Sequence, residues 1–172
     1  MNGRFKILPL NAEHNRSDFS SHNQALNRYF HQQVNQDICR RVTACYVAIE
    51  NETGLTAGYY TLAAGSIPLN DMPAELVKQL PRYKGIPVAR LGRLAVDARF
   101  CGIGLGGALL WDAAIRAVRS EVAVFALVVD AKDVSAVDFY RHHGFLEFGS
   151  LANQLILPLS QRILETHPKN QQ

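Results

Sequence analysis

Apolar side chains recur at helical spacing near the start of the chain. Four of them fall on one face of a helix: Leu26, Tyr29, Phe30 and Val34. Asn23 precedes them and is a suitable N-cap, because its short side chain can accept a hydrogen bond from the first turn. The spacing therefore predicts an amphipathic helix over 23–34.

The next stretch alternates between strand patterns and turn residues. Segments 42–50 and 55–64 are rich in Val, Ile, Tyr and Thr, and residues 51–54 between them read Asn-Glu-Thr-Gly. This arrangement predicts an antiparallel hairpin.

A short helix is expected over 72–80, with Asp71 as its cap and Pro73 in its first turn. Pro81 would end that helix, and Pro87 would lie in the connection after it.

The second half of the chain predicts alternating strands and helices. In order they are a strand over 88–97, a helix over 105–119, a buried strand over 122–130, a helix over 134–143 capped by Gly144, strands over 145–148 and 153–159, and a polar, frayed tail over 165–172. Such an order predicts an α/β fold, with a mixed sheet and helices on both faces.

Composition narrows the class of protein. The chain has 172 residues, of which 48% are hydrophobic and 19% charged, so we expect one packed domain over 1–172. No apolar run has the length of a signal peptide or a membrane span, which favours a cytoplasmic protein without a membrane partner. Three cysteines without CxxC spacing predict neither a disulfide framework nor a metal site. The net charge of +3 is only weak support for an anionic partner.

The most informative segment is a glycine-rich turn between a strand and a helix. Strand residues 91–97 lead into 102–107, where four of six residues are glycine, and a helix follows. Glycines permit positive φ and close approach of a ligand, and the helix start offers unpaired N–H groups, so the turn predicts a phosphate site. A tight turn with close packing is the alternative.

Two common phosphate motifs fit this turn poorly. A nucleotide P-loop needs Lys and Ser or Thr after its last glycine, but Ala108 follows Gly107. A dinucleotide fingerprint over Gly102, Gly104 and Gly107 would need an acidic residue at the end of the next strand, and Glu121 precedes that strand.

The turn resembles the phosphate motif of the GNAT N-acetyltransferases, Gln/Arg-x-x-Gly-x-Gly/Ala. It can be aligned from Arg99 or, in better agreement with Gly-x-Gly-x-Gly-x-x-Leu-Leu, from Cys101. The second alignment puts Cys101 and Ile103 where the family favours polar residues, which removes side-chain contacts to a pyrophosphate but keeps the backbone N–H groups. The run from Val128 to Phe145 also resembles the family's Asn-x-x-Ala-x-x-Phe-Tyr-x-x-x-Gly-Phe, with Asp133 in place of Asn.

From about residue 18 to 160 the chain most resembles the GNAT toxins of toxin–antitoxin pairs. Shared features include Leu26–Phe30, Ala57–Leu62, Leu80–Tyr83 and Leu91–Asp97. The resemblance implies a mostly antiparallel central sheet, acetyl-CoA as acetyl donor and aminoacyl-tRNA as acceptor, whose acetylation blocks translation. It also implies a ribbon-helix-helix antitoxin as partner and suggests a homodimer.

The resemblance assigns roles to individual positions. Tyr140 becomes the general acid that protonates the leaving thiolate. Contacts to CoA fall on a strand edge, the glycine turn and the later helix: Leu94, Ala95, Val96, Cys101, Gly102, Ile103, Gly104, Leu105, Gly106, Gly107, Asp133 and Phe139. A phenol with a pKa near 10 is protonated at neutral pH. Tyr140 could also be only a core aromatic.

No general base is evident. An α-amino group with an unperturbed pKa of about 7.7–8.0 is partly neutral at pH 7, so water can take its proton. His142 and His143 are better explained as caps of a helix C-terminus.

If the acceptor is tRNA, basic side chains should contact its phosphates. The candidates are Arg40, Arg41, Arg82, Lys84, Arg90 and Arg93, for which solvated surface charge is the alternative. Two other functions stay open. One is a GNAT enzyme that acetylates a protein or small-molecule amine, and the other is a non-catalytic acyl-CoA-binding module.

Overall fold

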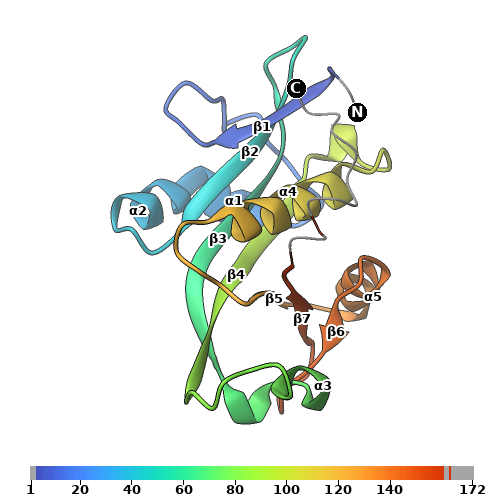
Figure 1. Ribbon diagram of the computed structural model, residues 1–172. Helices are drawn as coiled ribbons and strands as arrows, with labels where there is room; N and C mark the ends of the chain where they lie inside the picture. The colour runs from blue at the N-terminus through green and yellow to red at the C-terminus, as the bar shows by residue number, and fades with distance from the viewer. Residues whose placement is uncertain (1–2, 161–162, 164–172) are drawn as a thin grey trace. The chain divides into compact units, whose positions relative to one another are not determined.

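The computed structural model describes residues 3–160 and 163. Seven strands form one sheet in the order β1-β2-β3-β4-β5-β7-β6 (Figure 1). β1 pairs antiparallel with β2, β2 with β3, β5 with β7 and β6 with β7, whereas β4 and β5 are parallel. The predicted mixed, mostly antiparallel sheet is confirmed.

The elements follow the chain in alternating order. The strands are β1 (Phe5–Pro9), β2 (Ala44–Glu50), β3 (Thr56–Pro68), β4 (Gly85–Val96), β5 (Ala126–Asp130), β6 (Leu146–Glu147) and β7 (Gln154–Pro158). The α-helices are α1 (Gln24–Gln32), α2 (Val34–Cys39), α3 (Ala74–Val77), α4 (Leu105–Arg119) and α5 (Val134–His142), and two 3-10 turns are η1 (Leu69–Asp71) and η2 (Ala98–Phe100).

Contacts group the described residues into two compact units. The first holds 3–63 and 92–113, and the second holds 64–91, 114–160 and 163. β3 and β4 contribute to both. None of the helices in the described part of the chain has the length and hydropathy needed to cross a membrane.

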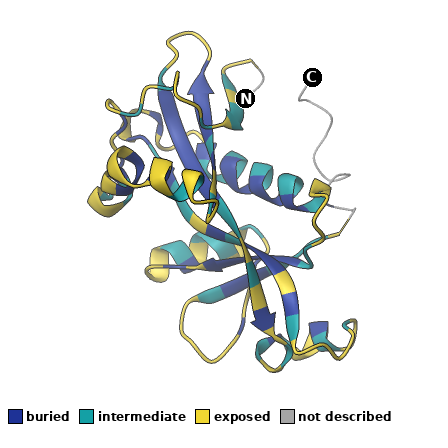
Figure 2. Ribbon diagram, turned by 90° about the vertical axis from the view of Figure 1, so that its left-hand side faces the viewer, coloured by how far each residue is buried: buried dark blue, intermediate teal, exposed yellow. Residues whose placement is uncertain are grey.

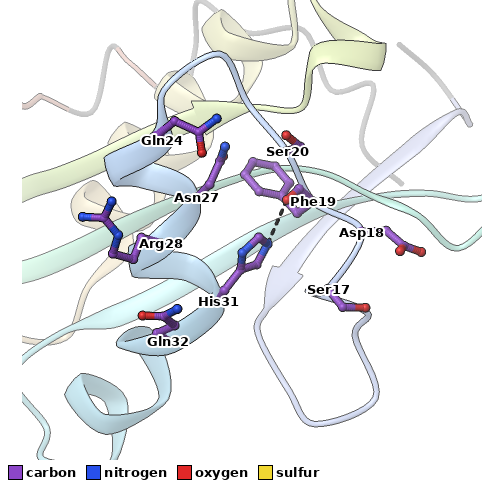
Figure 3. A pocket seen from close by; sticks show the side chains of 9 residues that line it. All are labelled: Ser17, Asp18, Phe19, Ser20, Gln24, Asn27, Arg28, His31 and Gln32. Carbon is purple, nitrogen blue, oxygen red and sulfur yellow. Dashed lines mark hydrogen bonds between the residues drawn. The ribbon is translucent and has the colours of Figure 1, made fainter.

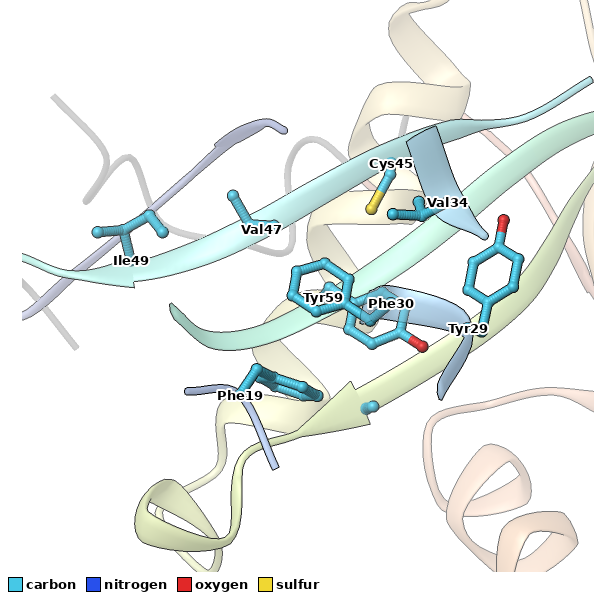
Figure 4. Packing of buried hydrophobic residues seen from close by; sticks show 9 residues of the cluster. Phe19, Tyr29, Phe30, Val34, Cys45, Val47, Ile49 and Tyr59 are labelled. Atoms are coloured by element: carbon cyan, nitrogen blue, oxygen red, sulfur yellow. The ribbon is translucent and has the colours of Figure 1, made fainter. Parts of the chain in front are cut away.

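In the first unit, helices cover both faces of the strands. Alternate residues of β3 point to opposite faces, so each face of β3 packs against a different helix. Tyr59 stacks on Phe30 of α1 with ring centroids 4.3 Å apart, in an apolar cluster drawn in Figure 4. On the other face, a Cβ added to Gly58 would lie 2.8 Å from the Cδ1 of Leu109, so only glycine lets α4 approach this closely. The Tyr60 hydroxyl donates to Asp112 of α4 at 2.5 Å.

The second unit has its own apolar core, shown as the buried segments of its strands in Figure 2. Val88 of β4, Val128 of β5 and Ile156 of β7 are fully buried there. Leu76 of α3 and Met72, which precedes that helix, pack against them.

The predicted helix over 23–34 is wrong in one respect, because it is two helices. Asn23 caps α1 as expected, accepting from the Leu26 N–H at 3.1 Å. α1 ends at Gln32, Gln33 is both its C-cap and the N-cap of the next helix, and α2 begins at Val34. Val34 is nevertheless fully buried against the same cluster, as the apolar spacing indicated.

The helix predicted over 72–80 is also shorter than expected, and Asp71 is not its cap. A residue before proline avoids the helical region, and Met72, which precedes Pro73, has a ψ of 146°. Pro73 itself has a ψ of 138° and is the N-cap, so the helix begins at Ala74.

Two strand predictions need correction in the second unit. Pro87 lies inside β4 and not in a connection; its carbonyl accepts from the Phe125 N–H at 2.8 Å. The strand predicted over 122–130 covers only Ala126–Asp130, and Val122 is 74% exposed. Hydrophobicity alone does not set strand length, since strands also need partners. The polar tail predicted over 165–172 lies outside the described residues.

Candidate active site

The glycine turn follows the end of β4 and opens α4. Gly102 has a φ of +78° and Gly104 a φ of +84°, a region that other residues enter only with strain. A Cβ added at either position would meet no atom within 4 Å. The predicted combination of left-handed backbone and open space beside it is therefore present.

The start of α4 presents backbone donors at this turn. The first helical hydrogen bond runs from the Ala108 N–H to the Gly104 carbonyl at 3.1 Å. The N–H groups of Leu105, Gly106 and Gly107 thus precede the helical hydrogen-bond ladder and lie at the positive end of a 15-residue helix. This geometry suits the oxygens of a phosphate or diphosphate.

The side chains of the turn add little polarity. Cys101 and Ile103 are both exposed, and the Cys101 thiol lies 3.5 Å from the Asp97 carbonyl oxygen. Arg99, which begins the alternative alignment, directs its guanidinium to the Asp97 carboxylate at 2.9 and 3.0 Å. Because Arg99 is paired with a carboxylate of its own chain, the alignment that begins at Cys101 is favoured.

Asp97 supports the start of the glycine turn, a role that sequence reasoning did not foresee. It is 1% exposed and accepts hydrogen bonds from the backbone N–H groups of Ser20 at 3.0 Å and Arg99 at 2.9 Å. The Ala98 N–H returns a bond to the Ser20 carbonyl at 2.9 Å. Asp97 therefore links the residues just before the glycine turn to the loop before α1 by hydrogen bonds.

The electrostatics of Asp97 follow from these partners. Burial alone would raise the pKa of its carboxyl, but the hydrogen bonds from Arg99 and Ser20 outweigh burial and hold the pKa below its usual value. A carboxyl whose pKa is lowered by folding stabilises the fold above its unfolded pKa, near 3.9, and ceases to do so as the pH falls through the folded value.

We therefore expect Asp97→Asn to lower the free energy of unfolding at pH 7 by about 2 kcal/mol, because an amide nitrogen cannot accept the bonds that the lost oxygen accepted. Urea denaturation at neutral and acidic pH would measure this. The difference from wild type should shrink below about pH 4, as the wild-type carboxyl is protonated. Asp138→Asn on the exposed side of α5 is the control. An equal loss in both variants, or a pH-independent difference, would contradict the assignment.

Tyr140 lies in α5 in the second unit, partly buried among aromatic rings. Its ring centroid is 5.3 Å from those of Phe139 and Phe145. Burial raises the pKa of the Tyr140 phenol to about 12. Within residues 3–160, no side chain or carbonyl accepts a hydrogen bond from its hydroxyl. The group is therefore a protonated donor available to a ligand.

The neighbours of Tyr140 mainly hold α5 in place. Asp133 caps the helix, accepting from the Ala136 N–H at 2.8 Å, so its carboxylate is engaged in the fold. A His143 ring nitrogen lies 2.8 Å from the Phe139 carbonyl oxygen, and Gly144 has a φ of +92°. The histidines and Gly144 thus sit at the helix C-terminus, where the sequence placed them.

The strand edge predicted to bind the thioester arm spans Leu94, Ala95 and Val96 at the end of β4. Ala95 is buried in the apolar cluster, and the other two are half-buried. The pairing of β4 with β5 runs from Val88↔Ala126 to Leu91↔Val129, and β5 ends at Asp130.

The basic candidates fall into three groups. Arg90 makes an ion pair with Asp130 at 2.8 Å. The Arg93 guanidinium carbon lies 3.4 Å from the centroid of the Tyr29 ring, an interaction that sequence reasoning did not foresee. The remaining four side chains are exposed: Arg40, Arg41, Arg82 and Lys84.

A polar hollow of about 410 Å³ also lies in the first unit, between α1 and the loop before it. Figure 3 shows His31 of α1 pointing toward that loop, with a His31 ring nitrogen 2.8 Å from the Phe19 carbonyl oxygen. No sequence pattern indicated this hollow, because its lining combines residues of a loop with residues from successive turns of a helix. No metal-binding cluster occurs within the described residues.

Comparison with known proteins identifies the family. The model of the acetyltransferase (GNAT) domain matches residues 18–154. A tRNA-acetylating toxin of Mycobacterium tuberculosis (strain ATCC 25618 / H37Rv) is 33% identical over 131 residues, covering 75% of this chain and 76% of the relative.

Two solved structures share the fold. AtaT complexed with acetyl-methionyl-tRNAfMet superposes with a TM-score of 0.78 at 27% identity, covering 90% of this chain and 94% of AtaT. A tyrosine-to-phenylalanine mutant of AtaT, bound to the C-terminus of the antitoxin AtaR and acetyl-CoA, gives 0.74 at 25% identity over 90% of this chain and 92% of that one. With a family match over most of its length and a relative at one-third identity, the chain belongs to the GNAT acetyltransferases.

Proposed function

We propose that this chain is a cytoplasmic, acetyl-CoA-dependent N-acetyltransferase toxin that acetylates the α-amino group of aminoacyl-tRNA and thereby blocks translation. The observation that carries the proposal is the turn with left-handed Gly102 and Gly104, which opens onto the free backbone donors of α4. The family membership and the kinship with tRNA-acetylating toxins support it.

The donor would bind by its diphosphate at the glycine turn. The N–H groups of Leu105, Gly106 and Gly107 are suited to its oxygens, and the exposed Cys101 and Ile103 would contribute contacts without charge. The pantetheine arm would pair with the backbone of Leu94–Val96, where main-chain N–H groups can polarise the thioester carbonyl. Asp133 and Phe139 would complete the site, Asp133 through its backbone, because its carboxylate caps α5.

The reaction is a direct transfer. The neutral α-amino group attacks the thioester carbonyl, a C–N bond forms, and the C–S bond breaks. Tyr140 would donate its phenolic proton to the departing thiolate, for which its protonated, unpartnered hydroxyl is suited. The ammonium proton passes to water, since an α-amino group with a pKa near 8 needs no strong base.

The acceptor and partners are proposed from the relatives. AtaT has been captured with acetyl-methionyl-tRNAfMet and with the antitoxin AtaR, and we propose an aminoacyl-tRNA substrate and a ribbon-helix-helix antitoxin for this chain too. A homodimer remains a prediction.

The test is incubation of the purified chain with radiolabelled acetyl-CoA and total aminoacylated tRNA, with deacylated tRNA as control. Label should enter only the charged tRNA and should leave it, as an acetylated amino acid, when mild alkali cleaves the ester. Label in protein or small amines alone would favour another acceptor. Acetyl-CoA binding by calorimetry without any labelled product would favour a non-catalytic acyl-CoA-binding module.

A further inference from the structure

Arg93, near the end of β4, has an unusual environment in the first unit. Its guanidinium carbon lies 3.4 Å from the centre of the Tyr29 ring, which is the distance of direct face-to-face contact. The Arg93 side chain is half-buried. The guanidinium therefore lies over the face of an aromatic ring.

The Tyr29 ring is itself held on both sides. It is 7% exposed and belongs to the apolar cluster with Phe30 and Val34, where Figure 4 shows it at the end opposite Ile49. Its hydroxyl donates to the Asp37 carboxylate of α2 at 2.8 Å. Burial, reinforced by this hydrogen bond, raises the pKa of the Tyr29 phenol, so the hydroxyl stays a donor. The ring beneath Arg93 is therefore held by packing and by a hydrogen bond.

The donors of Arg93 are uncommitted. A guanidinium carries five N–H groups, yet in the part of the chain that the structure describes none of them meets an acceptor. Arg90 and Arg99, which flank Arg93 along the chain, each pair with a carboxylate. The N–H groups of the half-buried Arg93, whose charge also acts on the Asp37 carboxylate, are therefore open to solvent and to a ligand's acceptor.

Gly92 precedes Arg93 on β4. A Cβ on Gly92 would lie 3.0 Å from the Thr61 hydroxyl, so Gly92 faces the same side of the sheet as Thr61 and Tyr59, which are two residues apart on β3. Arg93 faces that side too, through Tyr29. The buried Thr61 hydroxyl there also lacks a hydrogen-bond partner among the described residues.

We infer that Arg93 is a positioning residue that binds one phosphodiester of the single-stranded 3′ end of the acceptor RNA, an inference that rests on the proposed function. With one face on Tyr29, the guanidinium offers its N–H edges, which match two oxygens of one group. An aminoacyl-tRNA has no carboxylate at its ester, whereas each of its phosphodiesters supplies two such oxygens. Binding the strand here holds the terminal amine in register with the thioester.

The experiment measures aminoacyl-tRNA binding to the full chain between about 50 and 200 mM KCl without acetyl-CoA. Arg93→Gln should weaken binding about fivefold to tenfold and reduce the slope of log K against log salt by about 0.7, the value for one phosphate on a single strand. Arg93→Lys should keep most of the slope, because its charge remains, but lower kcat/KM, because the planar fork is lost. The control is Arg119→Gln, which removes the same charge from an exposed arginine at the end of α4.

A purely structural Arg93 predicts another outcome. In that case Arg93→Gln would lower the melting temperature, and it would weaken acetyl-CoA binding by the same factor as tRNA binding. The slope of log K against log salt would be unchanged, and the inference would be overturned. An unchanged slope in a stable variant would overturn it as well. If the wild-type chain neither binds nor acetylates aminoacyl-tRNA, the proposed function fails instead, so the two failures are distinguishable.

Discussion

Replacing Tyr140 with phenylalanine is expected to lower kcat about 100-fold to 1,000-fold while leaving acetyl-CoA affinity within about twofold of wild type, as for loss of a general acid. The aromatic contacts with Phe139 and Phe145 survive this change, since only the hydroxyl is removed. Single-turnover acetylation and calorimetry with acetyl-CoA would separate the chemical step from binding.

The pH dependence of the wild-type enzyme tests the same role. Burial raises the pKa of Tyr140 to about 12, so the phenol stays protonated well above the pH where an exposed tyrosine ionises, near 10. The rate should therefore rise as the acceptor amine loses its proton and should not fall again up to about pH 9, above which alkali cleaves the aminoacyl ester of the substrate.

Tyr83→Phe is the matched control, because Tyr83 is 65% exposed and carries the same hydroxyl. Its kcat should equal that of wild type. If the Tyr140 variant turned over at the wild-type rate, Tyr140 would be a core aromatic and another group would protonate the thiolate.

The parts of this protein that the sequence predicted well are those set by neighbours along the chain. α4 runs over Leu105–Arg119, as predicted, because the glycines force a turn before it and its apolar spacing continues without a break. The Gly144 cap and the hairpin of β2 and β3 were likewise encoded locally, by a left-handed glycine and a turn between two strand-forming segments.

The features that the sequence did not reveal depend on contacts between distant segments. β1 is an edge strand that pairs with β2 in the described chain, and its five residues carry too short a pattern to predict it. Asp97 meets Ser20 across 77 positions, and Arg93 meets Tyr29 across 64. No local spacing reports such pairs. The glycine turn could therefore be found from the sequence, whereas the groups that support it could not.

Gly104→Ala is expected to weaken acetyl-CoA binding about 10-fold to 100-fold, measured by calorimetry. Alanine at a φ of +84° is strained by about 1 kcal/mol. The larger effect comes from its methyl group, which would occupy open space beside the helix N-terminus. A diphosphate displaced from there loses about one charge-assisted hydrogen bond, which contributes about 1.5–3 kcal/mol.

Gly54 separates strain from ligand contact. It has a φ of +71° in the turn between β2 and β3, and a Cβ there would also meet nothing within 4 Å. Gly54→Ala should therefore cost a similar free energy of unfolding, about 1 kcal/mol, and leave acetyl-CoA affinity unchanged. Equal affinity losses in both variants would mean that strain is transmitted through the fold. No loss in Gly104→Ala would mean that the diphosphate binds elsewhere, because a ligand gripped by the first N–H groups of α4 cannot share the space of that methyl group.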